Sequence, residues 1–149
     1  MINMREIKME IEILELLYQN ILMIKESITN VIKTQKIDEN LNNDLKDCLL
    51  IYRKLIQAII GMLKTRNKEV KKLSIGEKMA TYMSIKINLG KSSNSRDIAK
   101  LIIHDISFIS TQIKESLNEY SKISKTIINL SNRIILTNET CIKNLTKFI

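Results

Sequence analysis

Apolar residues recur along this chain at steps of three and four, which is the period of one face of an α-helix. The clearest run lies between residues 40 and 72, where two rows of such positions run side by side. The rows are Leu41, Leu45, Cys48, Tyr52, Leu55, Ile59 and Met62, and next to them Leu49, Ile56, Leu63 and Val70. Two adjacent rows make a stripe wide enough to contact two neighbours, so the pattern predicts a bundle helix over about 40–72.

The same period predicts three further long helices, over about 4–34, 95–120 and 122–149. The first carries Ile7, Ile11, Leu14, Tyr18, Ile21 and Ile28. The next carries Ile98, Ile102, Ile106, Ile109, Ile113 and Leu117. The last carries Ile123, Ile127, Leu130, Ile134, Cys141, Leu145 and Phe148, flanked by Ile128, Ile135, Ile142 and Ile149. With no proline and only three glycines to form tight turns, the chain is poorly suited to an all-β fold.

The predicted helices are joined by connections of unequal length. A short polar stretch at 36–40 joins the first pair, and Asp38 is expected to cap the second helix. The last pair is joined at about 120–122. The middle connection is about twenty residues long, and Ser74 and Glu77 form a capping box that predicts a short helix over 74–88. Two hairpins joined by a long crossover predict an all-α, four-helix bundle with ferritin-like connectivity, forming a single domain over 1–149.

Gly61 lies inside the second predicted helix. A glycine costs about 1 kcal/mol relative to alanine in a helix interior. Its presence predicts close packing of a neighbouring helix at this position.

Four stretches carry a resemblance to a known group of proteins. They are 12–20 (EILELLYQN), 73–82 (LSIGEKMATY), 94–103 (NSRDIAKLII) and 142–149 (IKNLTKFI). On these the chain resembles uncharacterised ferritin-like proteins of Gram-positive bacteria, which implies a four-helix bundle. Residues 138–149 (NETCIKNLTKFI) also resemble flagellar export chaperones of the hook–filament junction type.

A ferritin-like fold raises the hypothesis of a di-iron or di-manganese centre. Such a centre needs a glutamate on each of two helices and Glu-x-x-His on each of the other two. The chain has one histidine, His104, it has no Glu-x-x-His, and it has no carboxylate between Cys48 and Asn67. We therefore expect no metal centre, no cofactor and no catalytic group, and we interpret the protein as a non-enzyme. His104 falls outside the apolar row, where a lone histidine is more often solvated than catalytic.

Two pairs of residues follow from the predicted topology. Lys25 and Asp105 lie about nine residues from the same end of the bundle, so we expect a partly buried ion pair between them. The alternative is that Lys25 extends outward and Asp105 meets water. Counting residues from one end of the bundle in the same way places Cys48 level with Cys141. We therefore expect neighbouring reduced thiols in the core.

The net charge is +8, and lysine supplies most of the 24 basic residues. One end of the bundle is expected to gather a basic patch, defined as Lys64, Arg66, Lys68, Lys71, Lys72 and Lys78. Arg5, Lys8, Lys122 and Lys125 would join it. The patch could meet an anionic partner such as RNA, lipid headgroups or an acidic protein. The alternative is a solvated helix end, and with only six aromatic residues the chain is poorly supplied for stacking on bases.

These observations favour a structural or protein–protein interaction role with an unknown protein partner. The alternative is an export chaperone that binds an amphipathic helix, and nucleic-acid binding ranks below both. The wide apolar stripes also leave room for a homo-oligomer. No transmembrane segment is expected, because the most apolar stretch, 49–63, is short and contains Arg53 and Lys54. Acidic residues near the start and two widely spaced cysteines favour a reduced, cytoplasmic setting.

Overall fold

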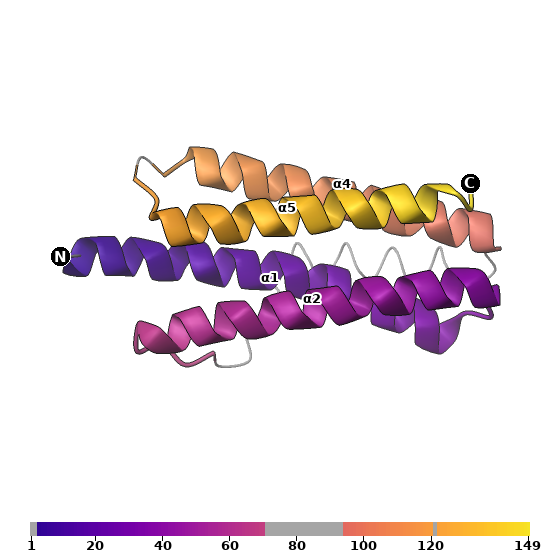
Figure 1. Ribbon diagram of the computed structural model, residues 1–149, viewed down its shortest axis with the longest axis horizontal. Coiled ribbons are helices and arrows are strands. Elements are labelled where there is room, and N and C mark those ends of the chain that lie inside the picture. The colour runs from indigo at the N-terminus through magenta and orange to yellow at the C-terminus, as the bar shows by residue number, and fades with distance from the viewer. Residues whose placement is uncertain (1–2, 71–93, 121) are drawn as a thin grey trace.

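The computed structural model describes residues 3–70, 94–120 and 122–149. These residues form four helices (Figure 1): α1 is Met4–Thr34, α2 is Glu39–Thr65, α4 is Ser95–Asn118 and α5 is Lys125–Thr146. No strand occurs within the described ranges. The predicted all-α, four-helix bundle is therefore confirmed, whereas the short helix predicted over 74–88 lies outside the described residues.

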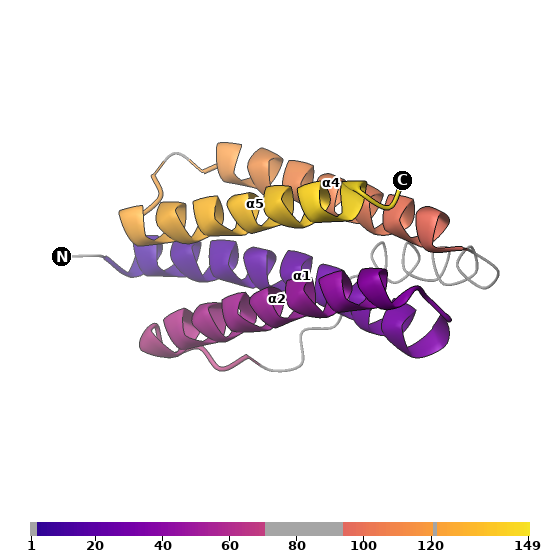
Figure 2. The same ribbon diagram turned by 45° about the vertical axis from the view of Figure 1, so that its right-hand side comes forward.

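The four helices pack as two antiparallel hairpins. α1 lies against α2 and α4, and α5 completes the bundle against α4 and α2. Figures 1 and 2 show that α2 and α4 run in one direction and α1 and α5 in the other, so each of these neighbouring pairs is antiparallel. α2 ends and α4 begins at opposite ends of the bundle. The connection between them therefore joins opposite ends, as in bundles that have one long crossover.

Each described helix begins at a side chain that accepts a hydrogen bond from a backbone N–H of its first turn. Asn3 accepts from Glu6 and Asn94 accepts from Asp97, both at 2.9 Å. Asp38 caps α2, as the sequence predicts, by accepting from the N–H of Asn40. Such caps satisfy donors that have no partner inside the helix, which fixes where each helix starts.

Several helix ends differ from the predicted bounds, and α4 and α5 end at Asn118 and Thr146 instead of 120 and 149. α2 ends at Thr65 instead of 72, because Asn67 adopts a positive φ of 58° and stops the helix. The N–H of Asn67 then donates to the carbonyl of Lys64 and the N–H of Lys68 to that of Leu63, which is the Schellman arrangement. α5 begins at Lys125 instead of 122, because the side chain of Ser124 caps it by accepting from the N–H of Ile127.

The core agrees with the predicted stripe on α2 but not with the stripe on α1. Every residue of the predicted main row of α2 is buried except Met62, which is half-buried. On α1, however, Ile7, Ile11 and Tyr18 are only half-buried. The buried face of α1 is turned toward a set that includes three polar residues: Glu10, Ile13, Leu14, Leu17, Asn20, Ile21, Met23, Ile24, Ser27, Ile28 and Val31.

This difference has a physical cause. α1 contacts all three other described helices, so its buried face is wider than a single row. Glu10, Asn20 and Ser27 interrupt the apolar pattern on that face, so the spacing of apolar residues alone does not predict which side of α1 is buried. A half-buried apolar flank, which includes Ile7 and Ile11, remains beside the core.

The expectation of close packing at Gly61 is wrong. Gly61 is exposed, and a Cβ atom built on it meets no other atom within 4 Å. Its residue position falls on the outer face of α2, opposite the row that contacts the other helices. Among the described residues, none makes a contact at this position that requires a glycine.

Candidate functional site

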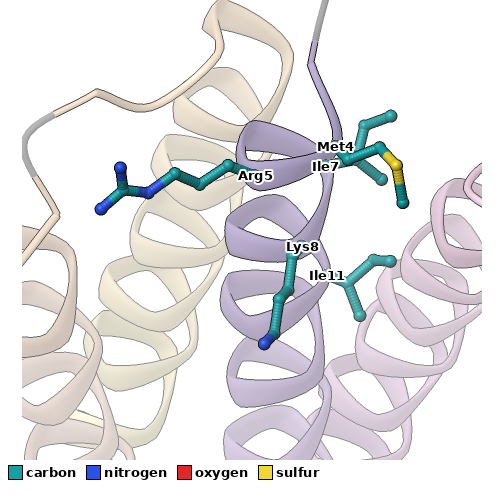
Figure 3. A pocket seen from close by; sticks show the side chains of 5 residues that line it. All are labelled: Met4, Arg5, Ile7, Lys8 and Ile11. Atoms are coloured by element: carbon teal, nitrogen blue, oxygen red, sulfur yellow. The ribbon is translucent and has the colours of Figure 1, made fainter.

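An apolar pocket of about 570 Å³ lies at the N-terminal end of α1. Met4, Arg5, Ile7, Lys8 and Ile11 line it, and Met4 is 86% exposed. Figure 3 shows Met4, Ile7 and Ile11 projecting from one side of the helix, while Arg5 points away from them. The pocket therefore combines an apolar floor with cations beside it.

Two more pockets border the same turns of α1. One, of about 610 Å³, is lined by residues of both charges: Asn3, Arg5, Glu6, Lys8, Met9, Glu12, Tyr120 and Lys122. Burial, and then the nearby carboxylates of Glu12 and Glu119, raise the pKa of the Tyr120 phenol. The other, of about 360 Å³, lies between α1 and the end of α2 and is lined by Ile7, Glu10, Thr65, Arg66 and Asn67. The N-terminal third of α1 is thus hollowed on more than one side.

The basic patch predicted at this end is partly neutralised by α1. Arg66 donates its Nε hydrogen to Oε2 of Glu10 at 2.7 Å, and Lys68 lies 3.7 Å from the carboxylate of Glu15. Lys64 is exposed. Lys71, Lys72 and Lys78, the other members of the patch, lie outside the described residues. Two of the three described members therefore pair with carboxylates of α1.

The Glu10–Arg66 pair was not expected from the sequence. Its side chains are only 5% and 16% exposed, and Arg66 also donates to the carbonyl of Met62. Glu10 precedes Leu17 by seven residues and therefore shares its helix face. This spacing is the one signal in the sequence that could have placed Glu10 in the core.

A layer of neutral polar groups crosses the middle of the bundle. The Tyr52 hydroxyl on α2 donates to Oδ1 of Asn138 on α5 at 2.7 Å, and Nδ2 of Asn138 donates to Ser110 Oγ on α4 at 2.7 Å. Tyr52 and Asn138 are completely buried. Because a buried polar group without a partner is costly, these bonds fix how the three helices align.

Cys48 and Cys141 lie beside this layer, both buried and both free thiols. The interaction with Cys141, followed by burial, raises the pKa of the Cys48 thiol far above its ordinary range. Hydrogen bonding from Cys48 stabilises the Cys141 thiolate and lowers the pKa of Cys141, although burial opposes this. Burial raises the pKa of Tyr52 well above 10.0. The two thiols expected to be neighbours therefore do lie together.

The structure gives Lys25 and Asp105, the expected ion pair, other partners. Nζ of Lys25 lies 3.9 Å from the neighbouring Glu26. Asp105 is buried and its Oδ2 accepts a hydrogen bond from Ser27 Oγ at 3.2 Å. The register between α1 and α4 is thus close to the expected one, but Ser27 faces Asp105 while Lys25 lies half-buried on the flank of α1. His104 is exposed on α4.

Within residues 3–70, 94–120 and 122–149, no group of three or more histidine, cysteine, aspartate or glutamate side chains gathers where it could hold a metal ion. In the same part of the chain, no helix combines the length and the apolar character needed to cross a membrane. Comparison of the chain with protein-family models, curated proteins and solved structures found no match.

Proposed function

We propose that this protein is a non-enzymatic helical bundle that binds a partner protein at the N-terminal end of α1. The observation that carries the proposal is the pocket formed by Met4, Ile7 and Ile11, in which a large apolar side chain is almost entirely exposed. Exposed apolar surface bordered by charge is typical of protein interaction sites. We expect the protein to work in the cytoplasm, as the cysteine content favours.

The partner that fits this pocket is an amphipathic helix with acidic residues beside its apolar face. The apolar face would pack on Met4, Ile7 and Ile11, in the manner of a helix in a groove. Arg5 and Lys8, which also line the pocket, would attract the acidic residues and orient the helix. Lys122, in the adjoining pocket, adds a third cation at the same end.

Three features support a bundle that is ferritin-like in connectivity but has no di-metal site. The described helices form two antiparallel hairpins whose connection joins opposite ends of the bundle. Two pairs of interior polar side chains are bonded to each other, Tyr52 to Asn138 and Glu10 to Arg66, which takes them from a reactive centre. A single histidine in the chain also falls short of the ligands that such a site requires.

A second candidate is an export chaperone that binds a helix along the outer side of α5. It is favoured by the row Ile128, Ile135, Ile142 and Ile149, whose first and last members are 42% and 50% exposed and whose middle members are half-buried. The four buried helix faces count against a chaperone that releases one of its own helices. Binding of RNA or lipid headgroups ranks lower, because Arg66 and Lys68 contact carboxylates of α1.

The test is capture of partners from native cells by tagged protein, followed by mass spectrometry, with three surface variants. We expect Met4→Asp to reduce capture of the partner at least about tenfold, because it places a charge in the apolar pocket. Leu50→Asp is the matched control, since Leu50 is an exposed apolar residue (52%) on α2 that does not line this pocket. Both positions are exposed, so neither change should alter stability much.

The third variant separates the two candidates. If Ile128→Asp loses the partner and Met4→Asp does not, the export-chaperone hypothesis is favoured and the α1 pocket is excluded as the binding site. Equal loss in Met4→Asp and Leu50→Asp would contradict the proposed site. Light scattering of the unmodified protein at the same concentrations tests whether the captured partner is a second copy of the chain.

A further inference from the structure

The seam between α2 and α5 holds two thiols at one level of the bundle. The hydrogen bond between Tyr52 and Asn138 fixes the register of these antiparallel helices. Cys48 precedes Tyr52 by one helical turn, and Cys141 follows Asn138 by nearly one turn. In antiparallel helices these two steps lead in the same direction. Cys48 and Cys141 therefore face each other across the seam.

The surroundings of the pair favour its uncharged forms. Cys48 is 3% exposed and Cys141 is 1% exposed, among apolar side chains of the core. Burial disfavours a thiolate at Cys48, in agreement with its raised pKa, whereas hydrogen bonding from Cys48 lowers the pKa of Cys141, the sulfur that reacts as a thiolate. A dithiol and a disulfide are both neutral, so either can occupy the seam without placing a charge in the core.

We propose that Cys48 and Cys141 are a redox couple of the native bundle, which closes reversibly to a disulfide that ties α2 to α5. The inference does not depend on the proposed partner-binding function. The chemical class of oxidant is a small-molecule disulfide such as oxidised glutathione. The crosslink would join the first hairpin to the second and close a loop of roughly ninety residues.

The reaction proceeds by two exchange steps. The Cys141 sulfur, as thiolate, attacks one sulfur of the small disulfide, forms a mixed disulfide and releases one small thiolate. The Cys48 sulfur then attacks the Cys141 sulfur of that mixed disulfide and releases the second small thiolate. The two cysteine protons pass to the released thiolates. Two protein thiols are thus oxidised and one small disulfide is reduced to two thiols.

Access to the buried pair comes from the end of α5. Cys141 lies five residues before Thr146, the last residue of that helix. Helix ends open locally far more often than the whole protein unfolds. Opening of the last turns of α5 therefore exposes Cys141 first, in agreement with its role as the attacking sulfur.

The experiment compares the oxidation equilibrium of the pair in the folded and in the unfolded chain. The full-length protein is equilibrated with reduced and oxidised glutathione, once in buffer and once in urea, starting from both the reduced and the oxidised forms. Acid quenching, alkylation and mass spectrometry then count the free thiols. Because a disulfide of good geometry stabilises the folded state, we expect the oxidation constant to be at least about thirtyfold larger in buffer than in urea.

A register control keeps the proposal open to refutation. In Cys141→Ser with Asn144→Cys, the thiol on α5 moves to an exposed position. Circular dichroism checks that this variant folds, because the serine places a hydroxyl at a buried position. The ratio of the oxidation constant in buffer to that in urea should then fall to near one. A ratio at or below one for the natural pair, an equal ratio for the control, or accumulation of glutathione adducts at Cys48 and Cys141 in the folded protein would each overturn the proposal.

Discussion

The middle of the α2–α5 seam and the N-terminal end of α1 handle buried polar groups in opposite ways. In the seam the groups are neutral, and Tyr52 and Asn138 bond each other in complete burial. At the end of α1 the groups are charged, and Glu10 meets Arg66 where the arginine keeps 16% of its side-chain surface in water. Removing a charge from water costs much more than removing a hydroxyl or an amide. Charge is therefore tolerated at the end of α1, whereas neutral polar groups take its place in the α2–α5 seam.

The largest effect is expected from breaking the charged pair. Arg66→Ala leaves Glu10 buried without its partner, and we expect the free energy of unfolding to fall by about 3 kcal/mol. Urea denaturation followed by circular dichroism measures the change. The double variant Glu10→Leu with Arg66→Met replaces both charges by apolar groups and should lie within about 1 kcal/mol of the wild type. A double variant as unstable as the single one would contradict this account.

A smaller loss is expected in the neutral layer. Tyr52→Phe removes the hydroxyl that donates to Asn138, so a buried amide oxygen loses its partner. We expect a loss of about 2 kcal/mol in the same assay, because an unsatisfied buried acceptor costs roughly 1–3 kcal/mol. If this loss equals or exceeds that of Arg66→Ala, the contrast between the centre and the end of the bundle is wrong.

The wild type and Tyr52→Phe can also be compared at alkaline pH. Burial raises the pKa of Tyr52 well above 10.0, so the phenol stays neutral in the folded chain while it ionises in the unfolded chain. The contribution of the Tyr52 hydroxyl to the free energy of unfolding is fully present below pH 10 and is lost as the pH rises further. The stability gap between wild type and Tyr52→Phe should narrow by about 1.4 kcal/mol between pH 9 and pH 11. A constant gap would show that water reaches the phenol.

The smallest predicted effect is a gain, on the outer face of α2. Gly61 is exposed and an added Cβ meets nothing, so Gly61→Ala should raise the free energy of unfolding by about 0.8 kcal/mol. Thermal unfolding by calorimetry detects such a shift. Because Gly61 lies nine residues from Tyr52, on the opposite face of α2, the gain should add to the effect of Tyr52→Phe without coupling.

The sequence predicted the bundle well where one helix face is apolar throughout. The main row of α2 is buried nearly as expected, and the neighbouring thiols follow from the same helical register. On α1 the predicted face was displaced, because Glu10, Asn20 and Ser27 lie in the core, where Glu10 pairs with Arg66 and Ser27 with Asp105. Periodicity counts apolar residues, so it cannot find a polar residue whose partner comes from another helix.

The amino-acid sequence by itself determined that the described part of the chain is helical, where most of its helices begin, and that it contains no Glu-x-x-His motif. These properties are local, since they depend on the spacing of apolar residues, on capping side chains and on which residue types exist at all. Only the tertiary structure decided that Ser27 and not Lys25 faces Asp105, and that Arg66 neutralises Glu10. Such pairings depend on the rotation of each helix about its axis, and that rotation is fixed by packing against its neighbours.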